Sequence, residues 1–211
     1  IGTAGGGLNK TTPHFQNFSR LQHSPFNANS LAHNFIWNIK QDEKGYIWFA
    51  TLNGIDRYDP KTRRFQHFQK FYDQNGKAVS NRITTLTIDR AGYVWFGNQQ
   101  GQVARFNPNQ NPTQVRVFDR SSFIHGNFSN NRIRLITSDR MNNIWIATDE
   151  GLALLDHQSG EFIEDFRYAS VGELGTSSVY TMFQDDQGIM WFGTWDSGLQ
   201  RYDPEFRKTT T

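Results

Sequence analysis

Four short segments of the chain carry side chains suited to binding a polar ligand. Each segment begins four residues after a recurring tryptophan, and the segments are Leu52–Asn53, Gln99–Gln100, Asp149–Glu150 and Trp195–Asp196. Amides and carboxylates hydrogen-bond hydroxyl groups, and an aromatic face such as that of Trp195 can stack on a sugar ring. These residue types therefore indicate recognition of a polar ligand. The alternative is that Trp195 packs against a neighbouring connection.

Residues that perform catalysis or bind metals lack the spacing that such sites need. The chain has no cysteine and no H-E-x-x-H or G-x-S-x-G pattern, and its opening glycines do not form a phosphate-binding loop before Lys10. The aspartates of four D-x-x-G segments lack the D-x-D-x-D spacing of a calcium loop. The histidines occur singly, at His14, His23, His33, His67, His125 and His157. We therefore expect no catalytic residue, no metal site and no cofactor.

The elements that position these residues are four copies of one repeat. The copies are centred on Trp48, Trp95, Trp145 and Trp191, at spacings of 47, 50 and 46 residues, and an aspartate precedes each tryptophan by six positions. Each copy contains four short strand-like runs. A period in this range with four strands per unit is typical of propeller blades. The predicted fold is all-β, a β-propeller fragment of four four-stranded blades plus the end of a preceding blade.

Turn chemistry within the repeat supports this prediction. Asp can bond its own following backbone, and the Gly three positions later can take the positive φ that such a hairpin turn needs. Copy three has Asn142 at this position, and Asn is the next most tolerant residue. Both faces of each sheet are apolar, so we expect each Trp to pack between blades. The third-strand arginines Arg57, Arg105 and Arg201 are expected to lie over this packing with their charge at the surface.

The repeat also predicts how the chain is divided. A blade tail covers residues 1–19, and complete blades cover about 35–71, 83–118, 133–168 and 179–211. Four and a half blades are fewer than the seven or so of a common ring, so we expect a piece of a longer propeller with two open edges. The stretch NPNQNPT (107–113) is a polar turn without an apolar period.

Composition excludes two classes of partner. The 22 basic and 20 acidic residues give a net charge of +2 without a concentrated basic face, which argues against nucleic-acid binding. No run of eighteen apolar residues occurs, so we expect no membrane contact by this segment. Any export signal is expected to lie outside the chain.

With these motifs in view, the copies resemble the two-component regulator propeller repeat, I-x-x-D-x-x-G-x-I-W-F-G-T-x-x-G-L-x-R-Y-D-P. Copies one and four carry it almost throughout, whereas copy two has Asn98 for Thr and copy three has Ile146 for Phe. The resemblance implies the non-catalytic, periplasmic sensor region of a bacterial membrane receptor with a histidine kinase or GGDEF cyclase output. It also implies that oligosaccharides are sensed, often by homodimers, in concert with other blades of the same receptor.

Two alternatives accompany this interpretation. One is a structural or protein-docking propeller. The other is a metal-dependent lyase resembling the streptogramin lyases, whose repeats carry W-F-T-E. The position of that glutamate is taken here by Leu52, Gln99, Asp149 and Trp195, so a single copy is acidic.

The predicted binding face is the side of the ring whose loops differ between copies. Blade-to-blade connections and the loops between second and third strands emerge on one side, and D-x-x-G turns on the other. Variable loops on a rigid scaffold usually carry recognition. The expected site residues are Trp195, Asp196, Asp149, Glu150, Gln99, Gln100 and Asn53, flanked by His125, Tyr72 and Arg132.

Overall fold

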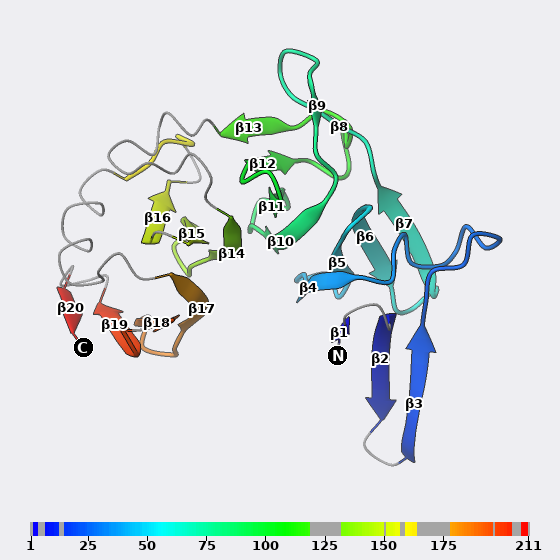
Figure 1. The fold of residues 1–211 in the computed structure, drawn as a ribbon, viewed down its shortest axis with the longest axis horizontal. Helices are drawn as coiled ribbons and strands as arrows, with labels where there is room; N and C mark the ends of the chain where they lie inside the picture. Colours follow the sequence, from blue (N-terminus) through cyan, green and yellow to red (C-terminus); the bar gives the residue numbers. More distant parts are fainter. Residues whose placement is uncertain are drawn as a thin grey trace.

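The computed structural model describes residues 2–3, 7–12, 15–118, 132–149, 151–156, 159–163, 178–195, 197–203 and 208–210 (Figure 1). Every regular element in this part of the chain is a β-strand. The strands form antiparallel sheets in which each strand pairs with the next along the chain.

The N-terminal half contains two of these sheets and a small hairpin. The first sheet consists of β1 (Gly2–Thr3), β2 (Gly7–Thr12) and β3 (Phe15–Leu21). Blade one consists of β4 (Ile36–Gln41), β5 (Ile47–Thr51), β6 (Gly54–Asp59) and β7 (Arg64–Phe68). The hairpin that follows consists of β8 (Phe71–Tyr72) and β9 (Ala78–Val79).

Three further sheets complete the described chain. Blade two consists of β10 (Ile83–Ile88), β11 (Val94–Asn98), β12 (Val103–Phe106) and β13 (Arg116–Phe118). Blade three consists of β14 (Ile133–Ser138), β15 (Ile144–Thr148) and β16 (Gly151–Leu155), with a bridge from Leu155 to Phe162. Blade four consists of β17 (Val179–Gln184), β18 (Met190–Thr194), β19 (Leu199–Asp203) and β20 (Lys208–Thr210).

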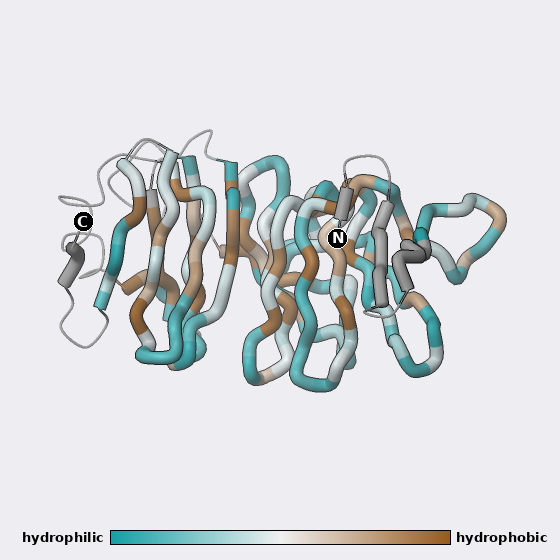
Figure 2. Tube along the Cα trace, turned by 90° about the horizontal axis from the view of Figure 1, so that it is seen from below, coloured by the Kyte–Doolittle hydropathy of each residue, from teal (hydrophilic) through white to brown (hydrophobic). Residues whose placement is uncertain are grey.

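The blades follow one another around an open arc. The first strand of each blade (β4, β10, β14 and β17) faces the middle of the arc, and the outer strands β7, β13 and β20 lie at its periphery (Figure 1). In the side view the strands run between two layers of loops (Figure 2). The chain is therefore an all-β propeller segment, as the repeat predicts.

The hydrophobic core lies between neighbouring blades, because the tryptophans of blades one to three each pack against the blade that follows. Trp48 belongs to a cluster with β10 and β11, Trp95 to one with β14 and β15, and Trp145 to one with β17 and β18. These three indoles are at most 1% exposed. The predicted packing of the tryptophans between blades is confirmed for these three copies.

The D-x-x-G turns have the predicted backbone. Gly45, Gly92 and Gly188 have φ of 84°, 83° and 87°, and Asn142 replaces glycine in copy three with φ of 69°. These values lie in the left-handed region that glycine, and then asparagine, adopts most readily. The turns therefore keep one geometry although one of them lacks glycine.

A β-bulge interrupts the first strand of every blade at the same place. In blade one Ile36 pairs with Thr51 and Asn38 with Ala50, so that Trp37 has no partner on β5. The same shift leaves Thr84, Arg134 and Tyr180 unpaired in blades two, three and four. A bulged residue is freed from the alternation of the strand and can be aimed differently from its neighbours.

Candidate functional site

The variable loops lie beside the ends of the connections between blades, as predicted. The loops after β5, β11 and β18 are each joined to the connection before a blade by a backbone hydrogen bond. These bonds run from Gly54 to Asn81 O (2.7 Å), from Gln99 to Arg82 O (2.9 Å) and from Trp195 to Ser178 O (3.0 Å). The two kinds of segment therefore form one surface.

On this surface, four side chains from blades three and four form a continuous series. Arg134, the bulged residue of β14, makes an ion pair through Nε with Asp149 Oδ1. Its guanidinium carbon lies 4.1 Å from the centre of the Tyr180 ring, a cation–π contact. The Tyr180 ring lies 5.3 Å from that of Trp195, at 30° to it. We call Asp149, Arg134, Tyr180 and Trp195 the ladder.

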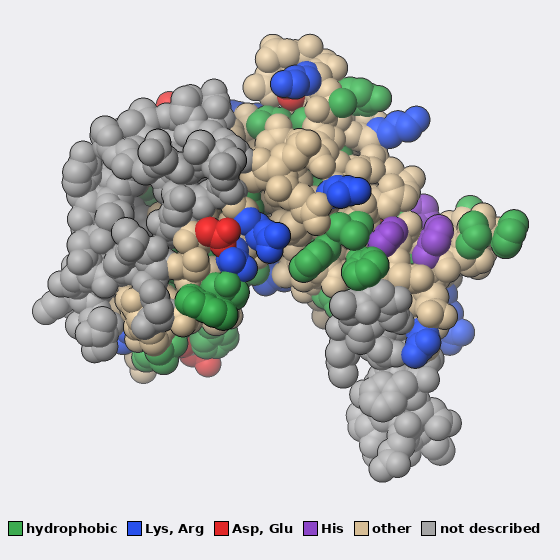
Figure 3. All heavy atoms as spheres, viewed as in Figure 1, with side chains coloured by type: hydrophobic (Ala, Val, Ile, Leu, Met, Phe, Trp, Pro, Cys, Tyr) green, Lys and Arg blue, Asp and Glu red, His purple; other side chains and the backbone are tan. Residues whose placement is uncertain are grey.

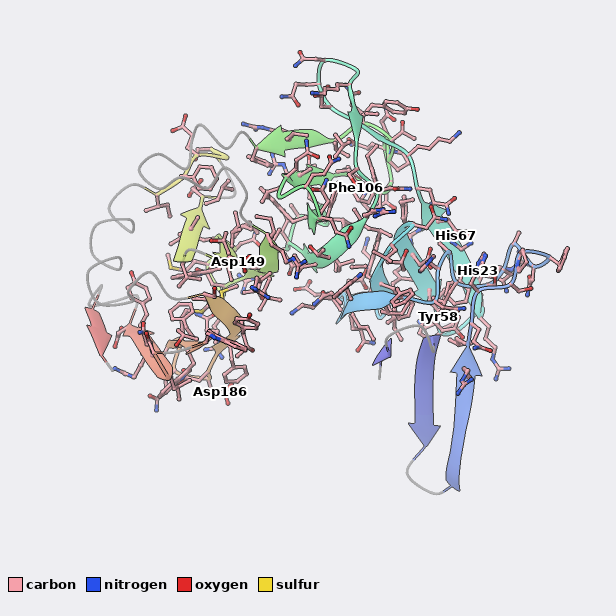
Figure 4. The ribbon with its side chains drawn as sticks, in the orientation of Figure 1. His23, Tyr58, His67, Phe106, Asp149 and Asp186 are labelled. Carbon is pink, nitrogen blue, oxygen red and sulfur yellow. The ribbon has the colours of Figure 1, made fainter. Side chains whose placement is uncertain are left out.

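The ladder is anchored at its base and open at its top. Ser178 Oγ donates to the backbone oxygen of Asp149 at 2.7 Å, which links the loop of blade three to the start of blade four. The side chains of Arg134 and Asp149 are 22% and 35% exposed, and Tyr180 and Trp195 as whole residues are 42% and 75% exposed. Figure 3 shows acidic, basic and hydrophobic side chains side by side at this part of the surface, and Figure 4 labels Asp149 there. The ladder therefore offers aromatic faces and hydrogen-bonding groups to solvent.

The structure thus brings two of the predicted residues together through two that the sequence analysis missed. Asp149 and Trp195 are joined by Arg134 and Tyr180, which occupy the bulge position of their strands. The first strands begin I-W-N-I, I-T-T-L, I-R-L-I and V-Y-T-M, so the second residue is the one that changes character most. That variation beside constant apolar neighbours is the signal that could have identified them.

The other predicted residues are distributed differently. Gln99, Gln100 and Arg132 are exposed on the face of variable loops. The amide of Asn53 links two connections: its Nδ2 donates to Ala32 O (3.4 Å), and its Oδ1 accepts from Asn81 Nδ2 (3.2 Å). Asn53 is therefore a structural tie between connections.

Tyr72 lies apart from the ladder. It belongs to the β8–β9 hairpin at the periphery, where its backbone exchanges hydrogen bonds of 2.8 Å with Thr113 and Val115 (Figure 1). The remaining predicted residues, His125, Glu150 and Asp196, lie outside the described residues.

Residues of the repeat that suggested other chemistry have structural partners. The aspartates of the D-x-x-G turns each accept a hydrogen bond from the indole of their own repeat, at 2.8, 2.8, 3.0 and 2.7 Å in copies one to four. Arg57 and Arg105 lie over Tyr46 and Tyr93, each at 4.7 Å, as expected for side chains that cover the packing between blades. Within the described chain, no group of three or more His, Cys, Asp or Glu side chains is placed to hold a metal ion.

Comparison with known proteins finds a family model and solved extracellular domains that are similar to this chain. The family model "Two component regulator propeller" matches residues 30–53 and 173–196. The extracellular domain of BT3049, assigned as a hybrid two component system of B. thetaiotaomicron, aligns over 98% of this chain with 25% identity and a TM-score of 0.78. That of BT4673 from the same organism aligns over 98% with 24% identity and a TM-score of 0.76. The chain spans about a quarter of the length of these two domains, 25% and 28%.

More distant structures share the fold alone. Virginiamycin B lyase from Staphylococcus aureus, as a catalytically inactive variant with quinupristin, aligns over 83% of this chain and 54% of its own, at 14% identity and a TM-score of 0.54. No curated protein sequence matches the chain. No helix in the described part of the chain is long and apolar enough to cross a membrane. The repeats, the blades built from them and the two matched segments together show that the chain resembles two-component regulator propellers.

Proposed function

We propose that the chain is the ligand-binding part of an extracellular sensor, and that its face of variable loops binds a small polar ligand of the oligosaccharide class. The observation that carries the proposal is the ladder. It offers the exposed rings of Trp195 and Tyr180 for stacking and the charges of Arg134 and Asp149 for hydrogen bonds to hydroxyl groups. A few fixed polar groups beside aromatic faces are typical of such sites. The likeness to extracellular domains of two-component systems supports the sensor role.

Several further features belong to this proposal. The segment is periplasmic and non-catalytic, and it acts with other blades of the same receptor, which is a homodimer. The receptor passes the signal to a histidine kinase or a GGDEF cyclase. Neither nucleic acid nor the membrane contacts this segment.

The contacts of Asp149 favour binding over lyase chemistry. Asp149 is the single acidic residue among the four positions that correspond to the lyase glutamate. Its carboxylate is engaged by Arg134, and Ser178 holds its backbone oxygen. A carboxylate that is ion-paired with a guanidinium can orient that cation beside the Tyr180 ring. In this arrangement Asp149 fixes the ladder.

Calorimetric titration of the chain with a panel of oligosaccharides tests the proposal. Trp195→Ala is expected to weaken binding of any ligand found about tenfold, because it removes the most exposed stacking face. Tyr180→Ala should act in the same direction. Phe26→Ala is the matched control, since Phe26 is an aromatic residue that is 98% exposed and lies outside the ladder.

The signalling role is tested in the complete receptor. The double variant Trp195→Ala/Asp149→Ala should weaken the response to ligand, and circular dichroism of the chain should remain that of the wild type. A full response from the double variant would contradict the proposal. Equal loss of binding after changes in the D-x-x-G face, without unfolding, would also contradict it.

A further inference from the structure

The third-strand arginine of blade two faces an unusual neighbour. Arg57 of blade one pairs across the sheet with Gln66 and donates a hydrogen bond from Nη2 to its Oε1, and Arg201 of blade four pairs with Thr210. Arg105 of blade two pairs with Arg116. Like charges directly opposite each other in an antiparallel pair are destabilising. Blade two therefore keeps two cations at a position where blade one has a cation and an amide.

Both guanidinium groups are held in place by aromatic rings. The guanidinium carbon of Arg105 lies 4.7 Å from the centre of the Tyr93 ring, and that of Arg116 lies 5.0 Å from the centre of the Phe118 ring. The ring of Phe118 also lies 5.8 Å from Arg105. Arg116 further lies against Gly160 of blade three, where an added Cβ would come within 3.0 Å of its Nη2. The two cations thus share one aromatic support.

The electrostatic environment of the pair favours an added negative charge. The pKa of Arg105 is lowered, first by burial and then by the positive charge of Arg116, and these two causes outweigh Tyr93 and the carboxylate of Asp89, which raise it. The two lowering causes disfavour the charged form, and an oxyanion beside the pair would oppose both. Arginine presents a planar fork of donors that matches carboxylate and sulfate groups.

The pair borders an open cleft of about 370 Å³ on blade two. Its other lining residues are amides, aromatic and apolar residues, several of them supplied by the polar stretch 107–113. The described residues that line the cleft, none of which is acidic, are Gln74, Tyr93, Arg105, Phe106, Asn107, Gln110, Asn111, Gln114, Val115 and Arg116. The amides are fixed in part: Gln74 Oε1 accepts from Val117 N (3.3 Å), and Asn111 Nδ2 donates to Gln114 Oε1 (3.3 Å).

We propose that this cleft is a second binding site, which takes a small ligand carrying a carboxylate or sulfate group. Arg105 and Arg116 bind the oxyanion, and the amides of residues 107–114 bind the polar body of the ligand. The cleft is on blade two and the ladder on blades three and four, as the labels of Phe106 and Asp149 show (Figure 4). The inference therefore does not rest on the proposed function.

The test is calorimetric titration of the purified protein with sodium glucuronate, sodium sulfate and glucose. Glucuronate or sulfate should bind and glucose should not, with an affinity that falls as ionic strength rises. Binding of glucuronate alone would identify an organic acid held by both arginines and amides. Equal binding of sulfate would identify a site for the inorganic anion. Absence of binding by both anions would overturn the proposal.

Substitution at Arg116 assigns the binding to this cleft. Arg116→Gln recreates the blade-one pair of Arg57 with Gln66 and is expected to weaken anion binding about tenfold. Arg64→Gln is the matched control, because it removes one charge from an exposed position of the outer strand of blade one. Arg116→Lys keeps the charge without the fork of donors, so its affinity for the anion should lie between those of the wild type and Arg116→Gln. Equal losses for Arg116→Gln and Arg64→Gln, or none for either, would contradict the assignment.

Discussion

Each tryptophan of the repeat is held by the carboxylate of the aspartate six residues before it, and each of the two oxygens of that carboxylate accepts a hydrogen bond. One oxygen of Asp89 accepts the backbone N–H of Tyr93 at 2.9 Å and closes the turn. The other accepts the indole N–H of Trp95 at 2.8 Å. A buried indole needs a partner for its N–H, and here the turn supplies it. This double use requires the six-residue spacing between Asp and Trp, which recurs in all four copies.

His67 is a second residue whose surroundings fix its state. Its Nδ1 lies 2.7 Å from Asp56 Oδ1 and its Nε2 lies 2.9 Å from Ala28 O. Both neighbours are acceptors, so both ring nitrogens donate when the imidazole is protonated. Asp56 is fully buried, and its Oδ2 accepts the backbone N–H of Ala32 at 2.8 Å. The pair therefore ties the connection before blade one to β6 and β7 (Figure 4).

The stability of this tie should depend on pH. The hydrogen bond to Asp56 is the largest cause that raises the pKa of His67 above the ordinary value of about 6.5. A raised pKa in the folded state means that the stabilisation is complete below the unfolded pKa and is lost as the pH rises through the folded pKa. We expect the melting temperature to fall as the pH rises from about 6 to 8.

His67→Gln serves as the comparison, because glutamine keeps a donor and does not titrate in this range. The melting temperature of the wild type should fall further between pH about 6 and 8 than that of the variant. A pKa of His67 at or below 6.5, measured by NMR titration, would contradict the expectation.

At the scale of the element, neighbouring blades are joined where their first strands run closest. The backbone N–H of Ile136 donates to Thr85 Oγ1 of the preceding blade at 3.0 Å. Thr84 Oγ1 donates to Ile133 O at 3.1 Å. Gly97 lies at the same interface, where an added Cβ would come within 2.5 Å of Ile133 Cγ2 and 2.8 Å of its Cβ. The second strand therefore approaches the next blade closely enough to exclude a methyl group.

Gly97→Ala is accordingly expected to lower the free energy of unfolding by about 1–3 kcal/mol, the usual cost of overpacking. Gly193→Ala is the control at the equivalent position of blade four, where the close contact is with Thr181 of the same blade. Denaturation by urea measures both. A smaller loss of unfolding free energy for Gly97→Ala than for Gly193→Ala would contradict the expectation, because it would show that the interface between blades two and three can accommodate the added methyl group.

How far the sequence predicts each element depends on whether its partners are local. The turn at Asn142 follows from residues within one repeat, and the packing of Trp95 between blades follows from the recurrence of that repeat; both are confirmed. The ladder depends on a bulge that re-aims Arg134 and Tyr180 and on the distance between two blades, which no single repeat encodes. Tyr72 was expected to flank the site, but its hairpin pairs with residues 113–115 of blade two, and this long-range pairing carries it to the periphery.

At the scale of the whole molecule, blade four ends the arc with a face that the other blades cover. Ile55 and Val103 are 0% and 1% exposed beneath the next blade, whereas Leu199, at the same position of blade four, is 61% exposed. Thr87 is 4% exposed and its counterpart Phe183 is 65% exposed. Figure 3 shows hydrophobic side chains at the surface of this end of the arc. This face has the composition of a blade interface.

The isolated chain should therefore self-associate through this face. Phe183→Thr/Leu199→Asn is expected to shift the chain toward monomer in sedimentation velocity, since it removes apolar area that association would bury. Phe26→Ser, which removes an exposed aromatic residue elsewhere, should leave association unchanged. In a longer protein with a following blade, the double substitution should lower stability instead. Association that persists in the double variant would exclude this face.

The bulge in the first strand of each blade has a consequence for how such a ring can change its specificity. Trp37, Thr84, Arg134 and Tyr180 stand outside the pairing of their strands, so replacing them alters no strand register. An indole, a hydroxyl, a guanidinium and a phenol already occupy this one position on a shared scaffold. The ring thus separates the part that must fold from the part that can diversify. Randomising Trp37, Arg134 and Tyr180, while keeping Thr84 for its bond to Ile133 O, would generate a library of receptors for new ligands on an unchanged frame.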